Sequence, residues 1–141
     1  MRTLPVLAAL IVTLVLAAPA GAAVKRLETN LKGSSATDAD GRGKAKLRLN
    51  RAAKRVCFTI TVRNIDDVVA AHIHRHSDGG IVVGLIEAPA TGDRFTGCTE
   101  DVSKSLISRI LRRPKRFYVN VHTTPFPGGA VQGTLHKPPK N

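Results

Sequence analysis

The sequence predicts an all-β protein, a β-sandwich with Greek-key connections and one short helix. Short segments alternate apolar and polar side chains with a period of two, as strands buried on one face do. Stretches rich in Gly, Pro, Asp and Ser separate these segments, which is typical of turns. A single segment has apolar residues at every fourth position instead, which is a helical period. Seven strands with short turns between them favour a sandwich.

Most of the predicted strands have one apolar face. In one of them Val69, Ala71 and Ile73 lie on one side, opposite Ala70 and the histidines that follow it. Residues 81–86 are apolar throughout, which is typical of a strand covered on both faces. The predicted strands span residues 26–31, 44–49, 56–62, 69–75, 81–86, 117–123 and 130–135.

The helix is predicted between the fifth and sixth of these strands. Val102, Leu106 and Ile110 recur at every fourth position. Acidic residues precede this segment and arginines lie near its end, an order that suits the helix dipole. Pro114 stops the pattern, so we expect a helix over residues 102–111.

Residues 1–23 have the features of a cleaved signal peptide. A short positively charged start precedes the uncharged segment Leu4–Ala18, and small residues follow it. At about 15 residues this segment is shorter than the roughly 20 that cross a bilayer as a helix. The alternative is an uncleaved anchor. We expect cleavage after Ala20, Ala22 or Ala23, leaving residues 24–141 as a secreted or periplasmic domain without a membrane span.

The chain is strongly basic, with a formal net charge of +12 that signal removal lowers by one. Such a charge predicts non-specific attraction to polyanions but identifies no extracellular partner. Four Phe, one Tyr and no Trp leave little surface on which unpaired bases could stack. A solvated basic surface is therefore favoured over specific recognition of nucleic acid.

The two cysteines, Cys57 and Cys98, are predicted to form one disulfide, because an exported chain meets an oxidising environment. A bond between them would close a loop over residues 57–98, and on the chain-entropy model this contributes about 4 kcal/mol to the free energy of unfolding. The alternative is two free thiols. Metal ligation by cysteine is disfavoured, because neither residue has a second Cys or His two to four positions away.

Two segments resemble signatures of the CHRD family, named after chordin. Residues 71–74 (AHIH) with 79–85 (GGIVVGL) resemble its central signature. Residues 117–123 (FYVNVHT) with 127–135 (PGGAVQGTL) resemble its C-terminal signature, although Gln132 stands where the family commonly has Arg. The placements of the two cysteines also resemble those of bacterial members.

The resemblance covers residues 27–135 and implies an extracellular, immunoglobulin-like sandwich whose biochemical role is poorly defined. It favours a non-catalytic binding module, since no acid–base pair, phosphate loop or cofactor fingerprint is visible in the sequence. In chordin such domains accompany growth-factor-binding modules, but that partner does not transfer to a lone domain.

The candidate site consists of histidines. On a strand His72 and His74 project from one face about 6.5–7 Å apart. His122 lies on another predicted strand, on the face opposite its apolar residues. Neutral imidazole ligands suit copper or zinc, so the three residues form a candidate metal site with copper as the first choice. His76 would join them if the strand continued that far.

The histidine pattern resembles the copper ligands of Cu/Zn superoxide dismutase, which is also a Greek-key sandwich. A bridging histidine, a His-rich zinc loop and an electrostatic arginine of that family are missing from this sequence. The alternative is structural: His72 and His74 would hydrogen-bond the backbone, Thr123 or Asn120 and so hold strand ends together. A carboxylate ligand could come from one of four acidic residues, Asp66, Asp67, Asp78 and Glu87. A copper-binding protein is therefore the second functional hypothesis beside the non-catalytic binding module.

Overall fold

The structure is a computed structural model that describes residues 23–33 and 36–140, so the predicted signal peptide lies outside the described residues except for Ala23. Eight strands, one α-helix and one 3₁₀-helix make up this part of the chain. In order they are β1 (Lys25–Lys32), β2 (Arg42–Asn50), β3 (Arg55–Arg63), β4 (Val68–Arg75), β5 (Ile81–Ile86), β6 (Arg94–Thr99), α1 (Lys104–Arg112), η1 (Pro114–Arg116), β7 (Phe117–Thr123) and β8 (Val131–Thr134).

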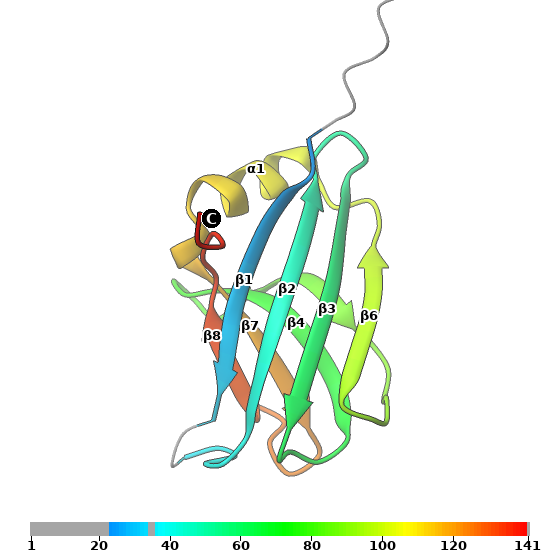
Figure 1. Ribbon diagram of the computed structural model, residues 1–141, viewed down its shortest axis with the longest axis vertical. Coiled ribbons are helices and arrows are strands. Elements are labelled where there is room, and N and C mark those ends of the chain that lie inside the picture. Colours follow the sequence, from blue (N-terminus) through cyan, green and yellow to red (C-terminus); the bar gives the residue numbers. More distant parts are fainter. Residues whose placement is uncertain (1–22, 34–35, 141) are drawn as a thin grey trace, which may run out of the picture.

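The strands form two layers of a sandwich that is almost closed into a barrel (Figure 1). One layer contains β1, β2, β3 and β6, and the other contains β5, β4, β7 and β8. All ladders are antiparallel, and β1 meets β8 at the pair Lys32–Gln132. At the opposite edge the Thr99 hydroxyl donates to the Gly84 carbonyl and links β6 to β5. The predicted all-β sandwich is confirmed.

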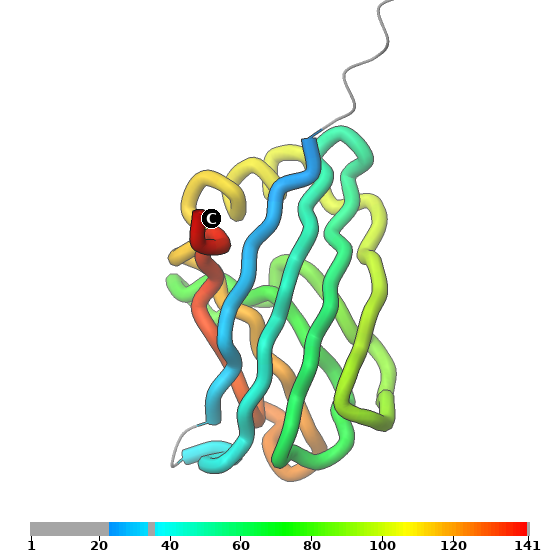
Figure 2. Tube along the Cα trace, viewed as in Figure 1, coloured from blue at the N-terminus to red at the C-terminus, as the bar shows by residue number. Residues whose placement is uncertain are grey.

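Neighbouring strands are not always consecutive in the sequence. β3 pairs with β6, and β4 pairs with β7. The chain therefore crosses between the layers after β3, after β5 and after β6, as the tube in Figure 2 shows. These crossovers agree with the expected Greek-key connections.

The strand β6 was not predicted from the sequence. Phe95 is its only buried residue, and the other side chains are exposed or half-buried. Without an alternating apolar face the segment has no strand signature. Its position is decided by pairing with β3 over residues 56–61.

The start of β4 also differs from the prediction. Val68, not Val69, is fully buried, and Val69 is half-buried. A register shift against β7 between Val68 and Ala70 breaks the alternation at this point. From Ala71 onward the predicted faces are correct, with Ala71 and Ile73 buried in the core.

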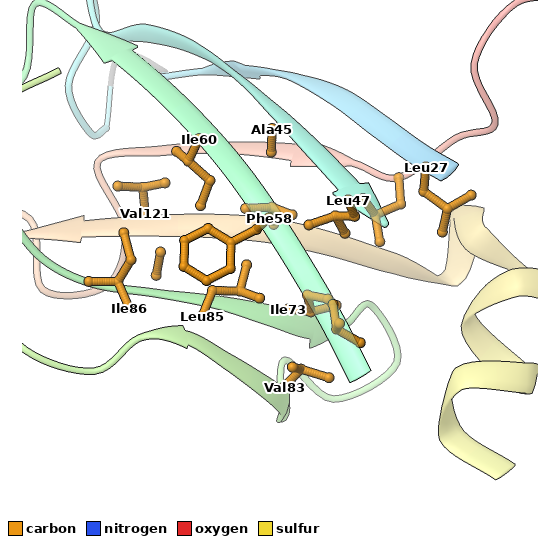
Figure 3. Packing of buried hydrophobic residues seen from close by; sticks show 14 of the residues in the cluster. Leu27, Ala45, Leu47, Phe58, Ile60, Ile73, Val83, Leu85, Ile86 and Val121 are labelled. Atoms are coloured by element: carbon orange, nitrogen blue, oxygen red, sulfur yellow. The ribbon is translucent and has the colours of Figure 1, made fainter. Parts of the chain in front are cut away.

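The core lies between the two layers (Figure 3). Phe58 and Ile60 of β3 face Ile73 of β4, Leu85 of β5 and Val121 of β7. Burial of such side chains contributes roughly 1.5–3 kcal/mol each before the entropy cost of folding. The alternating strands therefore place one apolar face inward and leave the other for polar side chains.

The helix α1 lies across one end of the sandwich and begins two residues later than predicted (Figure 1). The Ser103 side chain accepts a hydrogen bond from the Leu106 amide at 3.2 Å and caps the helix. Val102 is buried just before this cap, so the apolar period begins two residues before the helix. Ile107 and Ile110 bury the inner face of α1.

Cys57 and Cys98 lie opposite each other on β3 and β6 and form the predicted disulfide. Cys98 is exposed and Cys57 half-buried, so the bond lies on the outer surface of the sandwich. Across the described ranges, no helix is long and apolar enough to span a membrane.

Candidate metal site

The three histidines project from the outer face of the β4–β7 ladder. His72 and His74 lie on β4, and His122 lies on β7 opposite Ala70. Their neighbours on the inner face are core residues such as Ile73. Strand alternation therefore separates the imidazoles from the apolar core, as the sequence predicts.

Two turns cover this part of the outer face and bury much of the cluster. His74 is 6% exposed and His122 is 8% exposed. The side chain of His72 is 12% exposed. The covering turns are residues 76–80 after β4 and residues 124–130 after β7. The three imidazoles thus lie just below the protein surface, and His72 is the most exposed of them.

One ligand nitrogen from each of His72, His74 and His122 lies within 4.8 Å of the other two. The Nδ1 atom of His72 is 3.1 Å from Nε2 of His122. With metal–nitrogen bonds of about 2.0–2.1 Å, two ligand nitrogens can be at most about 4.2 Å apart. One ion could therefore contact all three nitrogens only if a separation as wide as 4.8 Å became shorter by about 0.6 Å or more.

Hydrogen bonds to backbone carbonyls orient two of the rings. His74 Nδ1 donates to the Gly79 carbonyl at 2.8 Å. His122 Nδ1 donates to the Pro127 carbonyl at 2.9 Å. In each neutral ring the Nε2 atom then carries a lone pair, and that of His122 faces His72 Nδ1. This second hydrogen bond on the far nitrogen is typical of metal-ligating histidine.

The Nε2 atom of His74 is buried and has no hydrogen-bond partner within the described part of the chain. A buried acceptor without a partner costs roughly 1–3 kcal/mol. Its lone pair belongs to the same cluster as the other two histidines. A cation bound there would satisfy it.

The third ring, His72, has a carboxylate on its far side. Its Nε2 atom lies 3.7 Å from Oε1 of Glu87. Gly84 lies opposite His72 on β5, and a Cβ atom at Gly84 would coincide with this carboxylate. Glycine at this position therefore leaves room for Glu87 beside the imidazole.

The local electrostatics disfavour protonation of two of the three rings, His72 and His122. Burial lowers the pKa of His72 from 6.5, and the neighbouring His122 lowers it further, although Glu87 acts in the opposite direction. Burial likewise lowers the pKa of His122, against the raising effect of its bond to Pro127. Both imidazoles are unprotonated at neutral pH and can act as ligands.

The pairing of β4 with β5 has two register shifts, and each directly precedes one of the histidines of β4. One lies between Ala71 and His72, and the other lies between Ile73 and His74. Such bulges re-aim side chains and occur next to functional sites. Periodicity alone could not place them, because they depend on the pairing of β5.

The structure separates His76 from the cluster. β4 ends at Arg75, and the Tyr118 ring lies between His74 and His76, with centroid distances of 5.1 and 4.7 Å. His76 Nε2 instead contacts the Thr134 hydroxyl at 3.1 Å. The stacking of Tyr118 on His74 had no signal in the sequence.

The structural alternative for the histidines is correct in one of its partners. His74 hydrogen-bonds the backbone carbonyl of Gly79, as that alternative expected. His72 contacts His122 instead, and the bonds of these two rings in the described residues do not involve Thr123 or Asn120. Of the four candidate carboxylates, Glu87 lies beside His72. Asp78 pairs with Arg75, and no contact joins Asp66 or Asp67 to the three histidines in the ranges the structure covers.

Comparison with known proteins supplies one further finding. Residues 27–135 match the family described as the CHRD domain. This range covers most of the chain and coincides with the resemblance drawn from the two signatures. Among curated proteins, none matches the chain.

Proposed function

The chain belongs to the CHRD family, and we propose that this member is a secreted, non-catalytic binding module that holds one copper ion on His72, His74 and His122. The observation that carries the proposal is the buried lone pair of His74 Nε2 within a cluster of three imidazoles. A site built only to connect strands has no need for an unsatisfied nitrogen at its centre.

The donor set favours copper. Three neutral imidazoles suit copper and zinc, and Cu(II) stands above Zn(II) in the usual order of affinity. Both cysteines are joined in a disulfide, so no thiolate competes for the metal. Three protein ligands leave a coordination position for water or another ligand.

The surrounding groups support the three ligands. The carbonyls of Gly79 and Pro127 hold the rings of His74 and His122 through Nδ1, which would leave Nε2 of each ring to bind the ion. His72 would bind through Nδ1, which moves its proton to Nε2 beside the Glu87 carboxylate. His72 Nδ1 and His122 Nε2 would then both be available to hold the ion.

The expected place of action follows from the family and the disulfide. A CHRD domain with a cross-strand disulfide fits an extracellular or periplasmic location. The predicted signal peptide, residues 1–23, supports export to that compartment. In such a compartment the module would bind copper outside the cytoplasm.

The proposal is tested by titrating Cu(II) into residues 24–141 purified without a histidine tag. We expect one copper per chain and an electron paramagnetic resonance spectrum with nitrogen couplings. His74→Ala and His122→Ala should each weaken binding by at least about a hundredfold, because a ligand is lost from a three-ligand site.

His136→Ala is the matched control, since His136 lies outside the cluster and its ring hydrogen-bonds the Lys137 carbonyl. It should bind copper as the wild-type chain does. Equal affinity of His74→Ala and His136→Ala would show that the cluster is not the site. Tighter binding of Zn(II) than of Cu(II) would contradict the choice of copper.

A further inference from the structure

We propose that a groove between α1 and the turn after β4 binds a short chain of phosphates. The groove has a volume of about 720 Å³. Leu106 and Phe117 contribute apolar surface to it. Its walls carry six basic side chains: Arg75, Arg109, Arg112, Arg113, Lys115 and Arg116. The site is separate from the three histidines and does not depend on the proposed copper.

Five of the six cations of the groove lack an acidic partner among the described residues. Arg75 pairs with Asp78 at 2.9 Å. None of the other five basic residues forms an ion pair with any residue in the described ranges, and no acidic residue lines the groove. Like charges gathered in this way repel one another and destabilise the surface. An anionic ligand would remove that repulsion.

Helix electrostatics account for part of the cluster only. Arg109 and Arg112 lie in the last turn of α1, where cations interact favourably with the dipole. Lys115 and Arg116 lie beyond the helix in the three-residue η1, which has no comparable dipole. Arg113 ends α1 through its backbone amide, so its side chain is free of that role. The side chains of Arg113, Lys115 and Arg116 are exposed. Stabilisation of the helix does not explain their positive charges, whereas binding of an anionic ligand does.

The shape and composition of the groove select the ligand. Its volume lies in the range of small-ligand pockets, about 300–1,000 Å³. Duplex DNA is recognised by protein elements that enter its grooves, whereas here the protein is the concave partner. Single-stranded nucleic acid needs aromatic surfaces for its bases, and the only Phe or Tyr in the groove, Phe117, is buried.

Arginine dominates the lining, and its planar fork forms paired hydrogen bonds to phosphate oxygens. A compact chain of phosphates places several such oxygens within one groove. The exposed Ser77 hydroxyl and His76 ring at the rim offer further hydrogen bonds to it. We therefore assign the groove to an oligophosphate in preference to a nucleic acid.

The test measures binding of sodium triphosphate to residues 24–141 by calorimetry at physiological salt. EDTA is present, so that bound metal contributes nothing. Arg112→Gln/Arg116→Gln should weaken binding by about tenfold or more, because two charge-assisted contacts are lost. In wild-type protein, triphosphate should shift the backbone amide resonances of Ser77 and Leu106.

The matched control is Arg63→Gln/Arg94→Gln, which removes the same charge outside the groove. Arg63 ends β3 and Arg94 begins β6, and these strand ends lie away from α1 (Figure 1). Neither residue lines the groove. The control should change triphosphate affinity by less than about twofold once salt screens distant charges.

Equal losses in the two double variants would overturn the proposal, since net charge alone would then explain binding. Tighter binding of heparin or of a short DNA duplex than of triphosphate at the same salt would overturn the ligand class. Circular dichroism and a thermal melt establish that each variant folds. If Arg112→Gln/Arg116→Gln does not fold, Arg109→Gln/Lys115→Gln takes its place and is compared with the same control. A loss of triphosphate affinity equal to that of the control would again overturn the proposal.

Discussion

His72 Nδ1 lies 3.1 Å from His122 Nε2 across the β4–β7 ladder, a distance at which the two nitrogens can share one proton. His122 Nδ1 already donates to the Pro127 carbonyl, so in the neutral pair the shared proton belongs to His72. Protonation of either ring would place a positive charge beside its neighbour in a partly buried position. The pair is therefore arranged for a neutral state or for a metal ion in place of the proton.

The first prediction concerns pH and folding without metal. The pKa values of His72 and His122 are lower in the folded protein than their usual 6.5. Below pH 6.5 the unfolded chain therefore binds more protons, and stability falls as pH drops from there towards the folded pKa values. Urea unfolding with EDTA at about pH 7.5 and about pH 5 should show this loss.

The control for this prediction is His72→Gln/His122→Gln. Other titrating groups are common to both proteins, so the loss of stability between the two pH values should be smaller in the variant. The same loss in both proteins would place its origin outside the histidine cluster.

A second prediction tests Glu87 as a positioning residue for His72. Glu87→Gln removes the carboxylate charge beside His72 Nε2 while keeping the shape of the side chain. Loss of such a partner weakens metal binding about 10- to 100-fold, and the exposed carboxylate here favours the lower figure. The control is Glu100→Gln, because Glu100 is also an exposed glutamate but pairs with Arg55. Equal Cu(II) affinities in the two variants would show that Glu87 has no role in orienting His72.

The disulfide should contribute to stability through the unfolded chain. Cys57→Ala/Cys98→Ala is expected to lower the free energy of unfolding by about 2–5 kcal/mol. Cys98 is exposed, so the substitutions leave no cavity in the core. Thr59→Ala/Thr96→Ala alters a facing pair on the same ladder without a cross-link and should have a much smaller effect. Denaturant unfolding of both variants decides whether the cross-link is the cause.

The last prediction concerns the turn that covers His122. Gly129 has a φ of +126°, and a Cβ atom there would overlap the Asn120 side chain. Asn120 Nδ2 holds this turn by donating to the Gly128 carbonyl at 3.0 Å. Gly129→Ala should therefore destabilise the fold by more than about 1 kcal/mol and weaken copper binding, because His122 loses its support. Gly128→Ala meets open space and should do neither, as thermal melts and titration of both variants would reveal.

The sequence by itself was sufficient for the fold class and for the choice of candidate ligands. Side-chain alternation is a local property, so the apolar faces of β3, of β4 from Ala71 onward and of β7 could be assigned before any pairing was known. The same alternation placed His72 and His74 on the face away from the core. The pairing of Cys57 with Cys98 followed from there being two cysteines in a chain with the features of export.

Tertiary structure alone decided what depends on contacts between distant segments. β6 is a strand because it pairs with β3, and its own side chains show no apolar alternation. The sequence offered four acidic residues as partners of the histidines and could not choose among them. The pairing of β5 with β4 places Gly84 opposite His72, and this glycine leaves room for the Glu87 carboxylate. The basic groove likewise needs α1, η1 and the turn after β4 side by side, a proximity that no local period encodes.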